Sequence, residues 1–216
     1  FFFNDTATTE IYTYGVVGSA SPILSLLLAL FVGVATGVGI LVAQRYGAKD
    51  RVLLAVVIGN CITLSAIVSV ITMIIGALIT RPMLELLSTP ASIIDWCADY
   101  LMIYFLGIAG FAYYNILSGV LRGMGDSLSA LGFLLVAAAL NVGLDLWFVA
   151  GLGMGVAGVA LATIISQAVS AVLVVIALMR RTDACKLYLN KLRFYKPQLA
   201  KILRIGLPAG IQSALF

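Results

Sequence analysis

The charged residues of this 216-residue chain fall in a few short groups, separated by long apolar stretches. Hydrophobic residues make up 62% of the chain and charged residues only 10%, whereas about a quarter of a soluble domain is charged. A run of ~20 apolar residues is long enough to cross a hydrocarbon core ~30 Å thick. Lipid offers no hydrogen-bond partner to the backbone, and these runs are too long for barrel strands. The sequence therefore predicts an all-α integral membrane protein.

Dividing the chain at its charges gives five complete transmembrane helices and the start of a sixth. The predicted spans cover residues 18–44, 52–80, 98–121, 129–150 and 156–179, and a further apolar run extends from Ile202 to Phe216. Loops rich in Lys and Arg stay in the cytoplasm. If the spans alternate in direction, every Lys and Arg except Arg81 falls on one side. We therefore expect a multi-pass protein of a bacterial-type cytoplasmic membrane, embedded in the lipid bilayer.

Several other classes of protein lack their characteristic residues here. The chain has no histidine, and its three cysteines are widely spaced, so neither a zinc site nor a disulfide framework is predicted. The net charge of +4 comes from the predicted loops, so it does not indicate a nucleic-acid partner. The Gly151-x-Gly-x-Gly155 turn is no phosphate loop, because no Lys-Ser/Thr follows it. We expect no cofactor.

One carboxylate lies within the fourth span, and the fifth span has none. Asp145 is the only Asp, Glu, Lys or Arg between Ser127 and Met179, and Asn141 precedes it by one helical turn. A charge at this depth costs ~2.5–3.5 kcal/mol on insertion scales, so such residues usually have a function. Side chains four apart on a helix point the same way and can share one ligand. The alternative is a protonated Asp that hydrogen-bonds a neighbouring helix.

The two ends of the chain differ from the rest. Residues 4–13 read NDTATTEIYT, which is the in-frame translation of a common sequencing-library adapter. We expect residues 1–13 to be an assembly artefact, which should be excluded from reasoning about the fold. The last residues stop within an apolar run. We expect the chain to be a fragment of a longer membrane protein.

Four motifs in a fixed order carry a family resemblance. They read FVGVATGVGILVAQRYGAKD from Phe31, LRGMGDS from Leu121, NVGLDLWFVAGLGMGVAGVALATIISQ from Asn141 and ILRIGLPAGIQS from Ile202. With these motifs the chain resembles the multidrug and toxic compound extrusion (MATE) family of cation-coupled efflux pumps. The resemblance implies twelve helices in two six-helix lobes around a central cavity, with helices two to seven represented here. Residues 14–181 would belong to the N-terminal lobe, residues 182–201 to a cytoplasmic inter-lobe linker and residues 202–216 to the start of helix seven. Helix one and the C-terminal lobe would be missing.

The resemblance also implies a cation site formed by Asn141, Asp145 and Thr163. Helix geometry supports the grouping independently: counted at ~1.5 Å per residue from a turn near Gly153, Asp145 lies ~12 Å deep, Thr163 ~15 Å and Asn141 ~18 Å. Carboxylate, amide and hydroxyl oxygens suit Na⁺, and a carboxylate alone suits H⁺. The alternative for Thr163 is a hydroxyl that bonds its own helix backbone.

Other polar or small residues in the spans have weaker assignments. Tyr100 stands where some family members have a cavity-facing Tyr, although it and Tyr104 could equally anchor the outer interface. Gln167, one turn from Thr163, could support the cation site from behind. The Gly33-x-x-x-Gly37 pair is most simply explained by close packing of two helices.

Taken together, these features predict a secondary active antiporter rather than an enzyme. It would export drugs or toxic organic compounds, often cationic, in exchange for Na⁺ or H⁺. One alternative is a lipid-linked oligosaccharide flippase, but such a protein needs cationic groups to hold pyrophosphate, and no Lys or Arg lies inside these spans. Another is an integral-membrane enzyme, for which clustered acids or metal ligands at one membrane face would be expected and none is seen. The substrate itself, and the choice between Na⁺ and H⁺, stay open.

Overall fold

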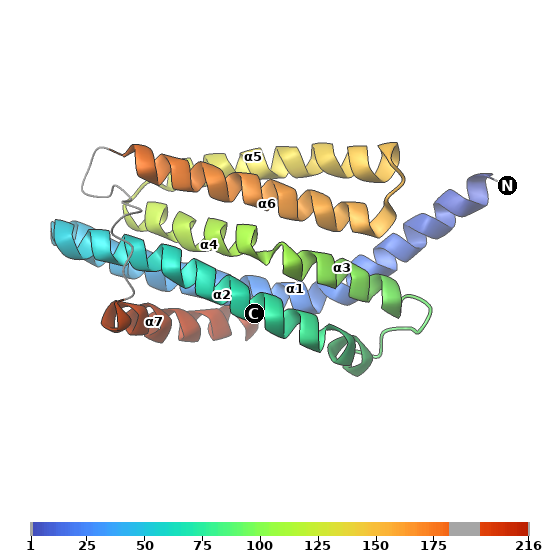
Figure 1. Ribbon diagram of the computed structural model, residues 1–216, viewed down its shortest axis with the longest axis horizontal. Coiled ribbons are helices and arrows are strands. Elements are labelled where there is room, and N and C mark those ends of the chain that lie inside the picture. Colours follow the sequence, from blue (N-terminus) through green and yellow to red (C-terminus); the bar gives the residue numbers. More distant parts are fainter. Residues whose placement is uncertain (1, 182–194, 216) are drawn as a thin grey trace.

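Helices account for nearly all of the described chain. The structure, a computed structural model, describes residues 2–181 and 195–215, with no strand among them. Its elements are α1 (Phe2–Gly47), α2 (Arg51–Leu86), α3 (Ile94–Leu106), α4 (Ile108–Gly123), α5 (Ser127–Asp145), the π-helix η1 (Leu146–Gly151), α6 (Gly155–Arg180) and α7 (Lys196–Leu215) (Figure 1). The predicted all-α fold is confirmed.

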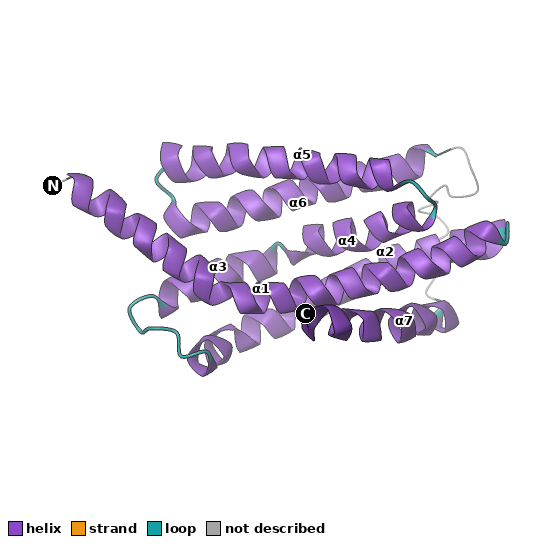
Figure 2. Cartoon of the chain, turned by 180° about the vertical axis from the view of Figure 1, so that it is seen from behind, coloured by secondary structure: helices purple, strands orange, loops and turns teal. Residues whose placement is uncertain are grey.

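The helices form layers, with α4 at the centre. On one side α5 and α6 lie together, and α6 contacts α3 and α4. On the other side α4 contacts α1 and α2, and α7 packs along the far side of α1 (Figure 2). α4 therefore connects the layer of α5 and α6 to the layer of α1 and α7. A smaller direct contact also joins α1 to α6.

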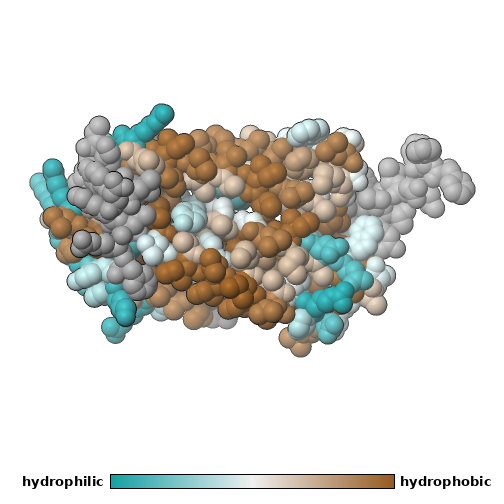
Figure 3. Space-filling model, viewed as in Figure 1, coloured by the Kyte–Doolittle hydropathy of each residue, from teal (hydrophilic) through white to brown (hydrophobic). Residues whose placement is uncertain are grey.

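Five apolar segments of the described chain can cross a membrane. Four are single helices: residues 20–47 of α1, the whole of α2, α5 together with η1, and α6. The fifth is the bent pair α3–α4. The surface agrees, because an apolar region fills the middle of the molecule and polar side chains gather towards its two ends (Figure 3). The five predicted complete spans are therefore confirmed, while α7 is not among the helices that meet the same criterion.

The third predicted span is not one continuous helix. It breaks at Gly107, where the axes of α3 and α4 differ by 51°. A Cβ built on Gly107 would lie 2.4 Å from the Cβ of Ile164 on α6, so the side chain of Ile164 occupies the space that any larger residue would need. Glycine also weakens a helix interior by its conformational freedom. The predicted span over residues 98–121 is thus a bent pair of helices.

Two aspartates begin helices at the end of the bundle that was predicted to be cytoplasmic. Asp50 accepts a hydrogen bond from the backbone N–H of Leu53 at 3.1 Å and starts α2. Asp126 accepts one from the backbone N–H of Ser129, also at 3.1 Å, and starts α5. Each carboxylate satisfies a backbone donor that has no partner within its helix. Short polar loops therefore suffice to separate the spans.

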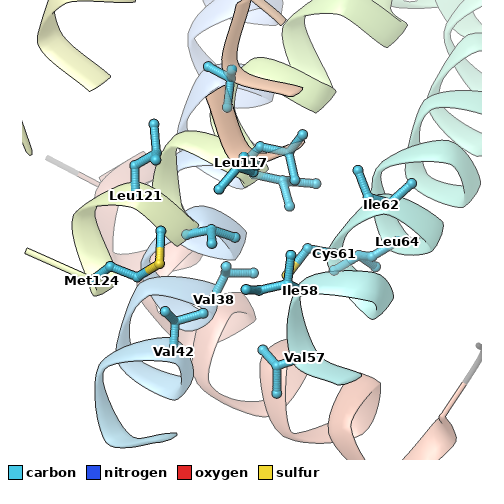
Figure 4. Close-up of a cluster of buried hydrophobic side chains, with 14 of the residues drawn as sticks. Val38, Val42, Val57, Ile58, Cys61, Ile62, Leu64, Leu117, Leu121 and Met124 are labelled. Carbon is cyan, nitrogen blue, oxygen red and sulfur yellow. The ribbon is translucent and has the colours of Figure 1, made fainter. Parts of the chain in front are cut away.

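Buried apolar side chains hold together the half of the bundle that was predicted to be cytoplasmic. Val38 from α1, Ile58 and Cys61 from α2, and Leu117 and Leu121 from α4 belong to one buried cluster (Figure 4). All five residues are fully buried. This packing joins the three helices through a shared core.

The seventh helix begins earlier than the sequence predicts. It starts at Lys196 rather than Ile202, so residues 196–201 of the predicted linker are helical, and residues 182–194 lie outside the described part. Two features explain the early start. Pro197 is favoured in a first helical turn, and the buried amide of Asn60 accepts the Tyr195 backbone N–H at 2.9 Å. At the other end α1 runs from Phe2 through the predicted artefact.

Candidate functional site

Asp145 lies where α5 changes into the π-helix η1. It is the last residue of α5, and residues 146–151 follow with the wider hydrogen-bonding pattern. Single π-turns inside membrane or soluble helices are rare and frequently occur at functional sites. The chain then reverses at Gly153, whose φ of 66° is accessible to glycine without strain. The predicted turn near Gly153 is confirmed.

Asn141 and Thr163 are in direct contact across α5 and α6. The Asn141 Nδ2 donates to Thr163 Oγ1 at 3.4 Å, and Thr163 Oγ1 donates to the Val159 carbonyl oxygen at 3.0 Å. The Thr163 hydroxyl therefore bonds its own helix, as one alternative held, and also accepts from the neighbouring helix. This bond uses the nitrogen of the Asn141 amide, so the amide oxygen is still available to accept a hydrogen bond or bind a cation.

Two further acceptors near this contact are buried and lack a donor. Within the described residues, Asp145 Oδ1 and Gln167 Oε1 are inaccessible to solvent and make no hydrogen bond. A buried oxygen without a donor normally loses about 1–3 kcal/mol, so its persistence needs an explanation. The structure does not join Asp145 to Asn141 or Thr163 by a hydrogen bond. What the structure does show is that the buried oxygens of Asp145 and Gln167 both lack a hydrogen-bond donor.

Buried aromatic rings adjoin the acidic residue. Tyr100 is 5% exposed and close enough to Asp145 for their side chains to interact electrostatically. The ring of Tyr104 follows at 6.5 Å between centroids, and Phe111 lies 6.3 Å beyond it. Both tyrosines are buried in the protein, and their role at a cavity stays a prediction. They line the inner side of the α3–α4 layer.

Two hollows flank the site. The outer one, of about 320 Å³, lies between the first turns of α3 and α6 and is lined by Asp99, Tyr100 and residues 153–157, with Trp96 at its edge. The inner one is a narrow slot beside the α3–α4 break, too tight to admit a water molecule, and it is lined by Tyr104 and Gly107 on one side and by Thr163 and Gln167 on the other. The site residues on α6 thus lie against the bend of the neighbouring span.

The donor set fits a hard monovalent cation or a proton. No group of three or more His, Cys, Asp or Glu side chains occurs in the part of the chain that the structure describes. One carboxylate, one amide oxygen and one hydroxyl are oxygen ligands of the kind that hard cations prefer. The unsatisfied acceptors of Asp145 and Gln167 agree with such a ligand. Their chemistry does not suit a transition metal.

Reasoning from the sequence missed two elements of this site. The π-helical turn after Asp145 has no signal in the sequence that we can identify. The break beside Thr163 had a weak one, because Gly107 and Gly110 are spaced three apart in an apolar run. At both glycines, atoms of α6 occupy the space that a side chain would need. A Cβ on Gly110, for example, would lie 2.7 Å from the backbone nitrogen of Ala168. That contact is visible only once the helices are packed.

Known proteins resemble most of this chain. The sequence model of the MatE family matches residues 13–147. The probable multidrug resistance protein YoeA of Bacillus subtilis (strain 168) is 31% identical over 206 residues, which are 92% of this chain and 44% of that protein. The multidrug export protein MepA of Staphylococcus saprophyticus is 28% identical over 194 residues, covering 90% and 43%.

Solved structures give the same result. An inward-facing and an outward-facing conformation of a multidrug resistance MATE family transporter of the MOP superfamily match with TM-scores of 0.88 and 0.87. Their sequence identities are 26% and 25%, and they cover 94% and 96% of this chain. The matches cover 46% and 48% of those chains. The chain therefore spans less than half the length of the relatives it matches.

Proposed function

Because this chain belongs to the MATE family of multidrug efflux transporters, we propose that it forms most of one lobe of a secondary active antiporter. The complete protein would export drug-like organic compounds and take up Na⁺ or H⁺ in exchange. In this proposal residues 14–181 belong to the first lobe, residues 182–201 connect the lobes and residues 202–216 open the second. Residues 1–13 stay assigned to a sequencing adapter.

The observation that carries the proposal is the buried carboxylate oxygen of Asp145, which has no donor among the described residues. It lies at the α5–η1 transition, one turn from the Asn141–Thr163 contact. A buried carboxylate is stable only when a proton or a cation neutralises it. A cation bound at Asp145, Asn141 and Thr163 would join α5 to α6 and supply the missing partner. Gln167 on α6 and Tyr100 on α3 would support the site.

Coupling follows from the two ligands having different affinities for the two lobe arrangements. A ligand shifts such an equilibrium only by the difference between its affinities for the two states. The cation would favour one arrangement and the drug the other, so that their binding is mutually exclusive. Alternating access by rocking of two repeats around a central site would then export the drug. The cation acts as the driving ligand and undergoes no chemistry.

The test removes the charge at Asp145 in the complete gene. We expect Asp145→Asn to abolish cation-driven drug export in inside-out membrane vesicles, because the amide cannot take up a proton and holds a cation weakly. Asp99→Asn is the matched control, since Asp99 is exposed at the outer hollow, and it should keep most of the activity. Both proteins should be present in the membrane at equal amounts. Export by Asp145→Asn at the unsubstituted rate would refute the assignment.

A further inference from the structure

The side-chain oxygen of Gln167 has no partner in the described part of the chain. Oε1 is inaccessible to solvent and accepts no hydrogen bond from residues 2–181 or 195–215. A buried acceptor without a donor is unfavourable, so it calls for a ligand or an ordered water. Water does not enter here, because the slot that Gln167 lines with Tyr104 and Gly107 is too tight to admit it. A ligand for this oxygen therefore has to be smaller than water.

Gln167 and Asp145 lie on opposite sides of the Asn141–Thr163 contact. Asp145 follows Asn141 by four residues on α5 and so lies nearer the turn at Gly153. Gln167 follows Thr163 by four residues on α6 and so lies further from that turn. Each is ~6 Å along its helix from the contact. The two buried oxygens that lack a donor thus flank the one hydrogen bond that joins α5 to α6 at this level.

Helix geometry turns both of these side chains towards the contact. The Cα–Cβ bond tilts towards the N-terminus of its own helix. α5 runs towards the turn at Gly153 and α6 runs away from it (Figure 1), so Asp145 leans away from the turn and Gln167 leans towards it. The oxygen of an extended Gln lies ~5 Å from its Cα, and that of an Asp ~3.5 Å. The ~12 Å between the two Cα levels is thereby reduced to about 4–6 Å between the oxygens.

This separation suits a metal cation better than a proton. A proton shared by two oxygens holds them only ~2.5–2.7 Å apart. Two oxygens that bind one hard cation at ~2.4 Å lie up to ~5 Å apart, on opposite sides of the ion. Thr163 Oγ1 and the available amide oxygen of Asn141 lie at the level between Asp145 and Gln167, where they supply further oxygen ligands. Four oxygens of this kind suit Na⁺.

The end of α3 adds a favourable electrostatic contribution. α3 ends at Leu106, within the span that it forms with α4, and Gly107 at its end lines the same slot as Thr163 and Gln167. The C-terminal end of a helix carries a partial negative charge. Helices that are interrupted within a membrane use such ends to bind Na⁺ in transporters. A cation between Thr163 and Gln167 would lie beside the end of α3.

We propose that Gln167 is a direct ligand of the coupling cation, together with Asp145, Asn141 and Thr163, and that this cation is Na⁺. The amide oxygen does not take up a proton near neutral pH, so it contributes to the binding of Na⁺ and not to the storage of H⁺. Gln167 thereby determines which ion the site uses. This inference rests on the proposed function, because it places the same ion at the same carboxylate.

Binding of Na⁺ to the purified complete protein is the first test. NaCl should raise the melting temperature more than KCl does, because a ligand of the folded state stabilises it and K⁺ needs a wider site. Gln167→Met keeps the length of the side chain and removes the oxygen. We expect it to raise the Na⁺ concentration for half of the maximal temperature shift by about ten-fold, as one lost polar contact does.

Two further substitutions at the same position keep the test independent of one variant. Gln167→Glu retains an oxygen at the same reach and should bind Na⁺ at least as tightly as the unsubstituted protein. Gln167→Asn retains the amide but withdraws its oxygen by ~1.5 Å, so it should weaken Na⁺ binding as Gln167→Met does. Gln167→Asn also serves if the Met variant does not fold.

Gln198 on α7 provides a matched control. Its Oε1 is likewise buried without a donor in the described chain, but it lies outside the site on α5 and α6. Gln198→Met removes the same atoms as Gln167→Met. It should leave the Na⁺ concentration for half of the maximal shift unchanged, whatever it does to the melting temperature itself.

Drug export by the complete protein in membrane vesicles is the second test. At saturating drug, Gln167→Met should need about ten-fold more Na⁺ for half-maximal export. At saturating Na⁺, its half-saturating drug concentration should stay within about two-fold of the unsubstituted value, because the drug does not contact the lost oxygen. A purely structural defect would change both values.

The possible results separate this inference from the proposed function. Unchanged Na⁺ binding in Gln167→Met, or an equal change in Gln198→Met, would overturn the role of Gln167. Export that a pH gradient drives at the full rate without Na⁺ would also overturn it, although the proposed antiport would then stand. If the proposed function itself is wrong, Asp145→Asn will export drug at the unsubstituted rate.

Discussion

Asp145 keeps a buried acceptor at the one place where α5 loses its regular hydrogen bonding. The residues after it form the π-helix η1, and the Asn141–Thr163 contact lies on its other side. At the membrane centre an unneutralised carboxylate costs ~2.5–3.5 kcal/mol on insertion scales. In the proposed site, a bound cation or proton would remove that cost. The proposed ligand would therefore stabilise the site chiefly at Asp145.

The Asn141–Thr163 contact gives the first prediction at this scale. Thr163→Val removes the acceptor of Asn141 Nδ2 and the hydroxyl oxygen, while keeping a similar shape. We expect the cation concentration for half-maximal transport to rise by about ten-fold, which is ~1.4 kcal/mol and typical of one lost polar contact. Thr163→Ser is the control and should stay close to the original value. An unchanged cation dependence in the Val variant would exclude Thr163 as a ligand.

The sequence was sufficient to predict that Asn141 and Thr163 are neighbours, but not that α5 ends at Asp145. Asn141 and Thr163 lie on regular helices that flank one turn, so a constant rise per residue predicts that they are neighbours. The structure places them in contact, while their role as cation ligands stays a prediction. The same constant rise assumes regular helix up to the turn. It could not indicate that α5 ends at Asp145, because π-helical hydrogen bonding depends on packing that the local sequence does not encode.

At the scale of elements, long-range contacts decided what local patterns could not. Apolar run length predicted the spans, because the bilayer thickness fixes it. The break between α3 and α4 depends instead on Ile164, which fills the space beside Gly107 from another helix. The early start of α7 likewise depends on Asn60. Neither partner is near in sequence to the residue that it affects.

The break predicts the effect of adding one methyl group. Gly107→Ala forces the new Cβ against Ile164 and should destabilise the protein by ~1–3 kcal/mol, the usual range for overpacking. Gly132→Ala on α5 is the control, because no atom lies within 4 Å of its Cβ position. Thermal unfolding of the purified complete protein measures both. Equal melting temperatures for the two variants would mean that Ile164 does not hold the break.

A pH dependence follows from the carboxylate that begins α5. Burial alone would raise the pKa of Asp126, but hydrogen bonds from Ser129 and the nearby Arg181 guanidinium outweigh it and lower the pKa below its ordinary value of 3.8. A group with a lowered folded-state pKa stabilises the protein above its unfolded-state pKa, and this stabilisation is lost as the pH falls towards the folded-state value. Arg181 ends α6, so the effect links α6 to the α4–α5 loop.

We therefore expect the unsubstituted protein to melt at a higher temperature than Asp126→Asn at neutral pH. The difference should be constant down to about pH 4 and shrink below it, as the Asp126 carboxylate takes up a proton. Melting curves of both proteins across this range are the measurement. A difference that persists unchanged in acid would show that the carboxylate charge does not contribute.

On the scale of the whole molecule, the central helix α4 connects two layers. The layer of α5 and α6 carries the proposed site of Asn141, Asp145 and Thr163, and in the layer of α1 and α7 the backbone at Gly33 lies against that at Gly210. α4 packs against both α6 and α1. In the proposed transporter, a cation bound at α5 and α6 would therefore reach α1 through packed helices. The chain covers under half of its relatives' length, so a second lobe on α7 would complete the cavity in the proposed transporter.

The central claim is that cation and drug move in opposite directions through one protein. The most direct measurement uses the complete protein in proteoliposomes, with a Na⁺ or H⁺ gradient imposed across the membrane and a fluorescent organic cation as the drug. We expect the drug to move against its own concentration gradient, opposite to the cation, and to stop when the cation gradient is dissipated. Drug movement that only equilibrates its concentrations, at the same rate with and without either cation gradient, would contradict the account.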